Sequence, residues 1–518
     1  MLRKIFVWLA ASFALPALAL DGEVIVHDPS TVIFHEGRFY TYGTGAGIPI
    51  LTSEDGWTWK RAGALMSAVP GGKAGPDVLA KGGNNTWAPD VIRIGNKFFV
   101  YYSAPGTQPK SAIGLLVCPT LSPEAANYKC EDRGPVVWSD GIEDSNAIDP
   151  GVLLDPEGRL WLVYGSYFGY IRLVELDPKT GLRRYPDRKA TNVAINSEAS
   201  ILIHRDGWYY LLVTHGSCCQ GASSTYNIRM GRSRKVTGPY LDNMGVDMVE
   251  GGGKLFAASR GRHIGPGHFG LLDLGEGVQK FSLHYEADLD RGGVSVLDIR
   301  PLLWRDGWPV AGDNLVAGTY VIESARTGTV LELGVQGFPV GGYRQRRGGP
   351  PGSGIVGSGP PTAGPAQGAP PPQGPPPPPQ IGPPIADQDP AQVAANWPAN
   401  TGVRLAPAML QAQQKWVIAA VDGAGGYPGA PYFRITVAGT ERSLTATKDG
   451  ELNATAFTSA AEQLWRIDQL VDGTYRISPK SVPGSTATWA LSAVGSSTPT
   501  LSKFDPASDR QRWLLGAP

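Results

Sequence analysis

The chain has 518 residues, and its 46 basic and 46 acidic side chains leave no net charge, which argues against a nucleic-acid-binding protein with its basic surplus. Glycine (68 residues) and proline (45 residues) together exceed a fifth of the chain, which argues against a mostly helical fold. The length predicts roughly two to four domains, and an apolar content of 42 % is sufficient for their cores.

Residues 1–19 are predicted to be a secretory signal peptide. Arg3 and Lys4 precede an apolar run over residues 5–15, and an Ala-Leu-Ala cleavage signature follows at residues 17–19. The run is too short to span a bilayer, and the rest of the sequence has no run of about 18 apolar residues. We therefore expect a secreted protein, extracellular or periplasmic, without a membrane partner.

Residues 20–310 are predicted to form many short β-strands. Apolar runs alternate with turn pairs such as Glu36-Gly37 and Asp206-Gly207, which is typical of hairpins. Five times an acidic residue or a histidine precedes the first strand of a group, at intervals of 62, 59, 49 and 70 residues: Asp28, Asp90, Asp149, Glu198 and His268. A propeller blade takes about 40–60 residues, so the spacing favours a five-bladed β-propeller with these side chains facing one channel. At any single position, a turn role is the alternative.

The four cysteines form two groups. Cys118 and Cys130 flank a short loop, and export permits disulfides, so we favour this pair. Cys218 and Cys219 are adjacent, and the sequence leaves open whether they form a vicinal disulfide or two buried thiols. Neither group has the ligand spacing of a zinc site.

Residues 311–518 are predicted to form a second domain, a β-trefoil. The pattern Gln-x-Trp occurs three times, with intervals of 49 and 48 residues, at Trp416, Trp465 and Trp513. This period resembles the ricin-type β-trefoil, in which the tryptophan packs into the core of each unit. A Pro/Gly-rich stretch at about 338–397 interrupts the first unit and is expected to be a disordered insertion. The sequence leaves open whether this domain binds sugar or serves as a spacer, because no aspartate recurs in all three units.

Four of the five channel residues are carboxylates, and three of them, Asp28, Asp149 and Glu198, could together perform glycosidic hydrolysis. An inverting glycosidase needs a general base and a general acid about 6.5–9.5 Å apart, with room for water between them. A third carboxylate nearby raises the pKa of the acid by like-charge repulsion. For each acidic residue, the alternative is a turn cap or an exposed side chain.

The motifs in residues 22–310 resemble those of glycoside hydrolase family 43, and in particular its endo-α-1,5-L-arabinanase branch. The motifs lie at residues 27–30, 87–90, 146–151, 197–199 and 265–269, with further pieces at 47–50, 164–169, 218–221, 224–229 and 306–309. The resemblance implies that Asp28 is the general base, Asp149 the residue that modulates the pKa, and Glu198 the general acid. It also implies hydrolysis by a single displacement with inversion.

The resemblance further implies residues for substrate and metal binding. Trp87 would stack under an arabinofuranose ring or pack into a blade core, and Asn146, Ser166 and Tyr167 would face the cleft or serve in turns. His268 resembles the histidine that holds a hydrated calcium ion in the channel; a structural hydrogen bond is its alternative. Because Ca²⁺ takes six to eight oxygen ligands, water would supply most of them.

Two departures from the family leave the linkage preference open. Ser197 and Ser200 flank the acid, where many members have an apolar residue and a proline, and Glu286 stands where aspartate is commoner. We expect a secreted, monomeric enzyme that cuts internal α-1,5-L-arabinofuranosidic linkages of plant cell-wall arabinan. The alternatives are an exo-acting α-L-arabinofuranosidase or β-xylosidase and, in another class, a non-catalytic carbohydrate-binding protein.

Overall fold

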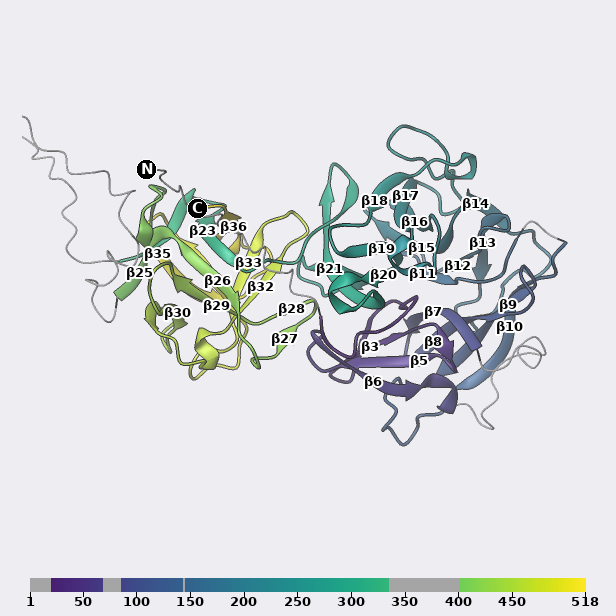
Figure 1. Cartoon of the computed structure of the whole chain (residues 1–518), viewed down its shortest axis with the longest axis horizontal. Coiled ribbons are helices and arrows are strands. Elements are labelled where there is room, and N and C mark those ends of the chain that lie inside the picture. Colours follow the sequence, from purple (N-terminus) through teal and green to yellow (C-terminus); the bar gives the residue numbers. More distant parts are fainter. Residues whose placement is uncertain (1–19, 69–84, 143–144, 335–400) are drawn as a thin grey trace, which may run out of the picture.

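The computed structural model describes residues 20–68, 85–142, 145–334 and 401–518. The predicted signal peptide and the predicted Pro/Gly-rich insertion lie outside these residues. The described chain is almost entirely β-structure, arranged as a ring of sheets beside a C-terminal sheet-rich region (Figure 1). Among the described residues, no helix has the length and apolar character needed to cross a membrane.

Five sheets form the predicted five-bladed β-propeller, which confirms the all-β fold class. Blade 1 contains β2 (Ile33–His35), β3 (Arg38–Tyr42), β5 (Pro49–Ser53), β6 (Thr58–Ala64) and β1 (Asp21–Gly22). Blade 2 contains β4 (Gly45–Ala46), β7 (Asn85–Ile94), β8 (Lys97–Pro105), β9 (Ser111–Cys118) and β10 (Glu131–Ser139). Blade 3 contains β11 (Gly151–Leu154), β12 (Leu160–Tyr164), β13 (Tyr170–Leu176) and β14 (Thr191–Ile195).

Blades 4 and 5 complete the ring. Blade 4 contains β15 (Glu198–Arg205), β16 (Trp208–His215), β17 (Asn227–Ser233) and β18 (Lys254–Ala257). Blade 5 contains β19 (His263–Asp273), β20 (Gln279–Asp288), β21 (Val294–Arg305) and β22 (Trp308–Ala311). The N-terminal segment closes the ring, because Gly22 pairs with Trp59 of blade 1 while Leu297 of blade 5 donates its N–H to the carbonyl of Val24 at 2.9 Å. Short 3-10 turns lie at η1 (Leu65–Ala68), η2 (Gly221–Ser223), η3 (Met248–Glu250) and η4 (Leu289–Arg291).

Hydrophobic clusters between neighbouring blades form the core of the propeller. Strands in the middle of a blade are therefore covered on both faces, and all eight residues of β9 are buried. This packing explains why many strands read as continuous apolar runs rather than as an alternation. The predicted Cys118–Cys130 disulfide is present at the end of β9, and Cys218 and Cys219 also form a disulfide.

The C-terminal region is built from one large sheet and two hairpins. The sheet contains β23 (Gly318–Ser324), β24 (Thr329–Leu333), β25 (Thr401–Pro407), β26 (Trp416–Ala420), β29 (Phe433–Val437), β30 (Arg442–Ala446), β31 (Leu452–Ala456), β32 (Trp465–Gln469), β33 (Tyr475–Pro479) and β36 (Trp513–Gly516). The hairpins are β27 (Gly426–Tyr427) with β28 (Ala430–Pro431), and β34 (Trp489–Val494) with β35 (Thr498–Lys503). A 3-10 turn precedes each of β26, β32 and β36, at η6 (Ala412–Gln414), η7 (Ala461–Gln463) and η8 (Asp509–Gln511).

The three Gln-x-Trp motifs occupy equivalent environments. Trp416, Trp465 and Trp513 are fully buried, and each indole N–H donates to a leucine carbonyl at 2.9 Å. The glutamine of each motif donates its amide to a backbone carbonyl, that of Pro407, Ala456 and Lys503 respectively. These tryptophans are therefore core residues that repeat three times in the sheet-rich C-terminal region, and the β-trefoil itself stays a prediction.

The propeller and the C-terminal region pack directly against each other. Lys280 is buried at this interface with its Nζ 5.6 Å from the ring centre of Tyr427. Burial lowers the pKa of Lys280 to about 8, although the charge of Asp468 opposes this shift. Within the described residues, three backbone hydrogen bonds cross the interface: Trp304 N–H to Val471 O (2.8 Å), Val471 N–H to Gly277 O (2.9 Å) and Gly429 N–H to Gly56 O (3.1 Å).

Replacing Gly426 by alanine is expected to loosen this interface. The added Cβ would lie 2.3 Å from the Cβ of Trp57, so the hairpin must move away from blade 1. Such overpacking costs about 1–3 kcal/mol and should lower the temperature of thermal unfolding measured by calorimetry. Gly402→Ala is the control, because nothing lies within 4 Å of its added Cβ. Equal unfolding temperatures for the two variants would contradict the tight interface.

Candidate active site

Five residues where the blades begin share a left-handed backbone conformation, and we call them the ring residues. They are Asp28 (φ 49°), Ala88 (φ 38°), Asp149 (φ 57°), Ala199 (φ 48°) and His268 (φ 58°). Such φ values are uncommon for non-glycine residues and need support from the surroundings. The backbone N–H of each ring residue donates to a side chain: Asp28 to His284 Nδ1 (3.0 Å), Ala88 to Thr44 Oγ1 (2.9 Å), Asp149 to Ser103 Oγ (2.9 Å), Ala199 to Asp149 Oδ2 (3.0 Å) and His268 to Thr214 Oγ1 (3.0 Å).

The predicted repeat was wrong at two of its five positions. In blades 2 and 4 the equivalent residues are Ala88 and Ala199, not Asp90 and Glu198. The pairing of β7 with β8 in blade 2, and of β15 with β16 in blade 4, shifts register beside the ring residue. A β-bulge of this kind turns the backbone locally. Asp90 instead is buried between blades, where its carboxylate accepts the backbone N–H groups of Thr31 (3.1 Å) and Val152 (3.0 Å). It therefore ties three blades together and does not face the channel as a ring residue.

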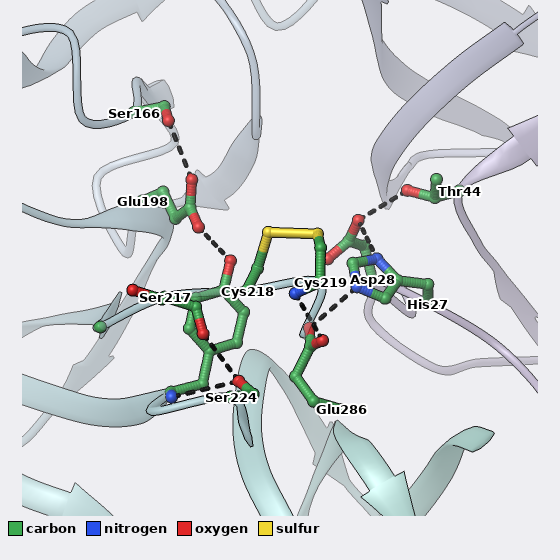
Figure 2. The surroundings of a disulfide bond; sticks show 12 residues. His27, Asp28, Thr44, Ser166, Glu198, Ser217, Cys218, Cys219, Ser224 and Glu286 are labelled. Carbon is green, nitrogen blue, oxygen red and sulfur yellow. Dashed lines mark hydrogen bonds and ion pairs between the residues drawn. A yellow bond between two sulfur atoms is a disulfide. The ribbon is translucent and has the colours of Figure 1, made fainter. Parts of the chain in front are cut away.

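Asp28 is held as a carboxylate. Its Oδ2 lies 2.8 Å from His27 Nδ1 and accepts the hydroxyl of Thr44 at 2.6 Å (Figure 2). Its Oδ1 lies 3.4 Å from His268 Nδ1. Burial alone would raise the pKa of Asp28. The charge of His27 and the hydrogen bonds from His268 and His27 outweigh burial and lower this pKa well below 3.8. Asp28 is therefore ionised, as a general base must be before it accepts a proton.

Glu198, immediately before a ring residue, has the opposite electrostatic environment. The hydroxyl of Ser166 donates to its Oε2 at 2.9 Å, and the hydroxyl of Tyr226 donates to its Oε1. Burial raises the pKa of Glu198, and the charge of Asp28 raises it further. The hydrogen bonds from Tyr226 and Ser166 oppose this shift without cancelling it. Glu198 is therefore suited to donate a proton.

Asp149 interacts electrostatically with both of the other carboxyls. Burial and the negative charges of Glu198 and Asp28 raise its pKa to about 8. Its Oδ2 accepts the N–H of Ala199, the residue next to Glu198, so the peptide that bears Glu198 is fixed to Asp149. Asp149 and Glu198 therefore both retain protons to higher pH than isolated carboxyls, mainly because both are buried.

The other predicted site residues have different surroundings. Trp87 is half-buried beside Ala88. Asn146 is fully buried, and its amide donates to Gln108, whereas its Oδ1 has no hydrogen-bond partner within the described residues. Tyr167 is 39 % exposed, and its hydroxyl donates to the carbonyl of Gly216 at 2.6 Å. Of the predicted substrate residues, only Ser166 is hydrogen-bonded to one of the three carboxyls in the described structure.

Three contacts in the site were missed by sequence reasoning. Thr44 and Tyr226 bind Asp28 and Glu198 directly, and Glu286 binds His27 at 2.9 Å. Tyr226 lies in the family-like motif at residues 224–229, and Glu286 is one of the two departures from the family. The resemblance therefore pointed to both residues. Their partners come from other parts of the ring, and no spacing in the sequence indicates those pairings.

The cluster of His27, His284 and Glu286 has donor atoms within 4.8 Å of one another, but its hydrogen bonds are inconsistent with a metal site. His284 Nδ1 accepts the N–H of Asp28, so its Nε2 bears the hydrogen and donates to Glu286 Oε1 at 3.1 Å. Both ring nitrogens of His27 face carboxylate oxygens, so both are donors. Neither histidine therefore offers a free lone pair to a metal.

His268 fits a metal ligand better. Its Nδ1 lies 3.4 Å from Asp28 Oδ1. Burial lowers the pKa of His268, but the contact with Asp28 and its charge outweigh burial and raise this pKa. When the ring is neutral with its hydrogen on Nδ1, Nε2 has a lone pair for a metal. No hydrogen bond of this Nε2 is found in the described part of the chain. Metal-binding histidines commonly donate their second ring nitrogen to a carboxylate in this way. The chemistry of His268 is thus compatible with one cation in the channel.

The three carboxyls differ in their electrostatic environments. Asp28 has a lowered pKa, Glu198 a raised pKa, and both interact electrostatically with Asp149 or with each other. These are the parts of an acid–base glycosidase.

Comparison with known proteins specifies the family. The description of glycosyl hydrolases family 43 matches residues 22–309, so the chain belongs to glycoside hydrolase family 43, and it is a glycosidase. It is 34 % identical to the extracellular exo-α-(1→5)-L-arabinofuranosidase ArbA of Cellvibrio japonicus, over 58 % of this chain and 91 % of that one. It is 33 % identical to the extracellular endo-α-(1→5)-L-arabinanase 1 of Bacillus subtilis, over 55 % and 87 % of the two chains.

Among solved structures, the chain resembles an α-L-arabinanase of Cellvibrio cellulosa complexed with arabinohexaose. The TM-score is 0.52 at 31 % identity, and the match covers 56 % of this chain and 96 % of that one. These matches cover little more than half of the chain, an extent comparable to the propeller.

Proposed function

We propose that this protein is secreted and hydrolyses internal α-1,5-L-arabinofuranosidic linkages of plant cell-wall arabinan with inversion. The observation that supports the proposal most strongly is the opposite shift of two carboxyl pKa values in one channel, down for Asp28 and up for Glu198. Two relatives, an extracellular arabinofuranosidase and an extracellular arabinanase, support the proposed substrate and secretion.

The proposed reaction is a single displacement. Asp28 accepts a proton from a water molecule as the water oxygen attacks the anomeric carbon. Glu198 gives its proton to the glycosidic oxygen as the bond from that oxygen to the anomeric carbon breaks. Asp149 fixes the backbone next to Glu198 through the N–H of Ala199, and we propose that it modulates the pKa of the acid. Trp87 is proposed to stack on a sugar ring, and Asn146, Ser166 and Tyr167 to line the site.

We also propose a calcium ion held by His268 and otherwise by water. Its role would be electrostatic, because a cation beside Asp28 and Asp149 favours their charged forms. The nitrogen ligand is unusual for Ca²⁺, which prefers oxygen, so water must supply most of the coordination.

Product analysis separates the endo-acting proposal from its alternatives. The exo-acting alternative deserves testing because ArbA of Cellvibrio japonicus is named an exo-enzyme. Debranched arabinan treated with the protein should give mixed arabino-oligosaccharides early in the digest, as resolved by anion-exchange chromatography. Arabinose alone would indicate exo action, xylose from xylo-oligosaccharides would indicate the β-xylosidase, and no sugar from either would favour a non-catalytic binding protein.

Tyr226→Phe is expected to move the basic limb of the pH profile upward. The hydroxyl of Tyr226 lowers the pKa of Glu198, so its removal raises that pKa. Activity requires protonated Glu198 and is lost as pH rises through this pKa, so the limb of kcat/KM should shift upward by about 0.5–1 pH. Tyr320→Phe is the control, since its hydroxyl donates to the carbonyl of Val316 in the C-terminal region. A downward shift, or the same shift in the control, would contradict the assignment of the acid.

A further inference from the structure

The Cys218–Cys219 disulfide is connected to the candidate base by a chain of hydrogen bonds (Figure 2). The N–H of Cys219 donates to Glu286 Oε2 at 2.7 Å. The other oxygen of Glu286 lies 2.9 Å from His27 Nε2, and His27 Nδ1 lies 2.8 Å from Asp28 Oδ2. Three contacts therefore lead from the disulfide turn to Asp28.

Glu286 depends on these contacts. Its side chain is only 2 % exposed, so water does not compensate its charge. Its Oε1 receives hydrogens from His27 and His284, and the only described donor to its Oε2 is the N–H of Cys219. Loss of the Cys219 contact would leave one oxygen of a buried carboxylate without a partner, which favours rotation of the carboxylate.

The disulfide accounts for the direction of the Cys219 N–H. Cys219 has a left-handed φ of 64°, a conformation that residues other than glycine adopt rarely. The flanking loop is fixed elsewhere, because Ser217 N–H donates to Thr225 Oγ1 (2.9 Å) and Ser224 Oγ donates to the carbonyl of Ser217 (2.7 Å). The bond between Cys218 and Cys219 closes a small ring around their shared peptide and restricts its rotation. Without that bond, Cys219 is free to return to a negative φ and to turn its N–H away from Glu286.

We propose that the Cys218–Cys219 disulfide is a redox-sensitive positioning element for the base, and that Glu286 and His27 are the positioning residues that connect it to Asp28. The role assigned to Asp28 rests on the proposed function. Reduction consumes two electrons and two protons: the S–S bond breaks and two S–H bonds form. With a trialkylphosphine as the reductant, phosphorus is oxidised and takes the oxygen of one water molecule, whose hydrogens go to the two thiols.

Two double variants of the full-length protein separate this disulfide from the other one. Cys118→Ser with Cys130→Ser leaves only the vicinal pair to be reduced, and Cys218→Ser with Cys219→Ser leaves only the distant pair. In the first variant, phosphine treatment should lower kcat on arabinan by about tenfold with KM changed less than about twofold, the size expected for one hydrogen bond to a charge. In the second variant, kcat should already be low and should not respond to phosphine.

Glu286 provides an independent test through substitution. In Glu286→Gln the amide oxygen can still accept the N–H of Cys219, but its NH₂ then faces the two imidazole N–H groups. This variant should lose about 10–100-fold in kcat with little change in KM, because His27 loses a charged partner. Glu286→Asp keeps the charge and should recover most of that loss. Equal losses in the two variants would indicate a packing role and overturn the proposal.

A spectroscopic measurement makes the test independent of activity. The two hydrogen-bonded N–H protons of His27 should give downfield ¹H NMR signals, assigned by their absence in His27→Gln. Reduction of the Cys118→Ser, Cys130→Ser variant should shift these signals. Unchanged signals and unchanged kcat after two thiols have been titrated would overturn the proposal, as would a rise in KM alone. If the untreated protein releases no sugar from arabinan, the proposed function fails, and the NMR signals still decide whether the disulfide positions His27.

Discussion

Glu198→Gln is expected to lower kcat on arabinan by about 10²–10⁴-fold, the usual contribution of general acid catalysis. Glutamine has nearly the same shape and can keep the contacts with Ser166 and Tyr226, so the loss would arise from the missing proton. The measurement is steady-state hydrolysis of debranched arabinan at the pH optimum of the wild-type protein. Glu157→Gln, at an exposed turn of blade 3, is the control and should be unaffected.

The leaving group distinguishes acid catalysis from a general loss of structure. A dinitrophenolate departs without protonation, so Glu198→Gln should hydrolyse a dinitrophenyl arabino-oligosaccharide with a loss below about tenfold. A loss of the same size on both substrates would show that Glu198 has another role. Near-normal activity on arabinan would remove it from the catalytic machinery altogether.

Asp28→Asn is the second substitution with a large expected effect, again a loss of about 10²–10⁴-fold in kcat. The asparagine side chain cannot accept a proton from water, and it replaces a carboxylate that His27, Thr44 and His268 surround. Initial rates on debranched arabinan would measure the loss, and Asp206→Asn in an exposed turn of blade 4 would serve as the control.

Azide provides a second readout for Asp28→Asn. This anion attacks without a base, so it should restore sugar release and yield a β-arabinofuranosyl azide. Recovery with an α-azide would indicate that the nucleophile approaches from the other face of the ring. Loss of activity in Asp206→Asn as well would indicate a nonspecific effect on folding.

The five-bladed fold could be predicted because the sequence repeats a polar residue before each group of strands. Asp28, Asp149 and His268 stand at ring positions, as this pattern indicates. Ala88 and Ala199 could not be recognised, because the register shifts beside them depend on strand pairing and alanine is not a distinctive signal. The pattern therefore gave the number of blades but not the residue of each blade that occupies the ring.

The contacts that determine the chemistry of the site were harder to predict. His27 and Glu286 are 259 positions apart in the sequence, and the propeller brings them together because the N-terminal segment pairs with blade 1 and hydrogen-bonds to blade 5. The vicinal disulfide was left open because a sequence does not reveal the backbone conformation of Cys219. The Gln-x-Trp motifs allowed a correct prediction of core residues, because each tryptophan is buried and donates its indole N–H to a backbone carbonyl.

The measurement that tests the central claim most directly is the configuration of the first product released from debranched arabinan. In the proposed single displacement, water activated by Asp28 attacks as Glu198 protonates the leaving oxygen, so each event inverts the anomeric carbon. ¹H NMR during the first minutes of digestion should show the β-anomer of the new reducing end before mutarotation produces the α-anomer. Initial formation of the α-anomer would mean a double displacement and would contradict the roles assigned to these two residues.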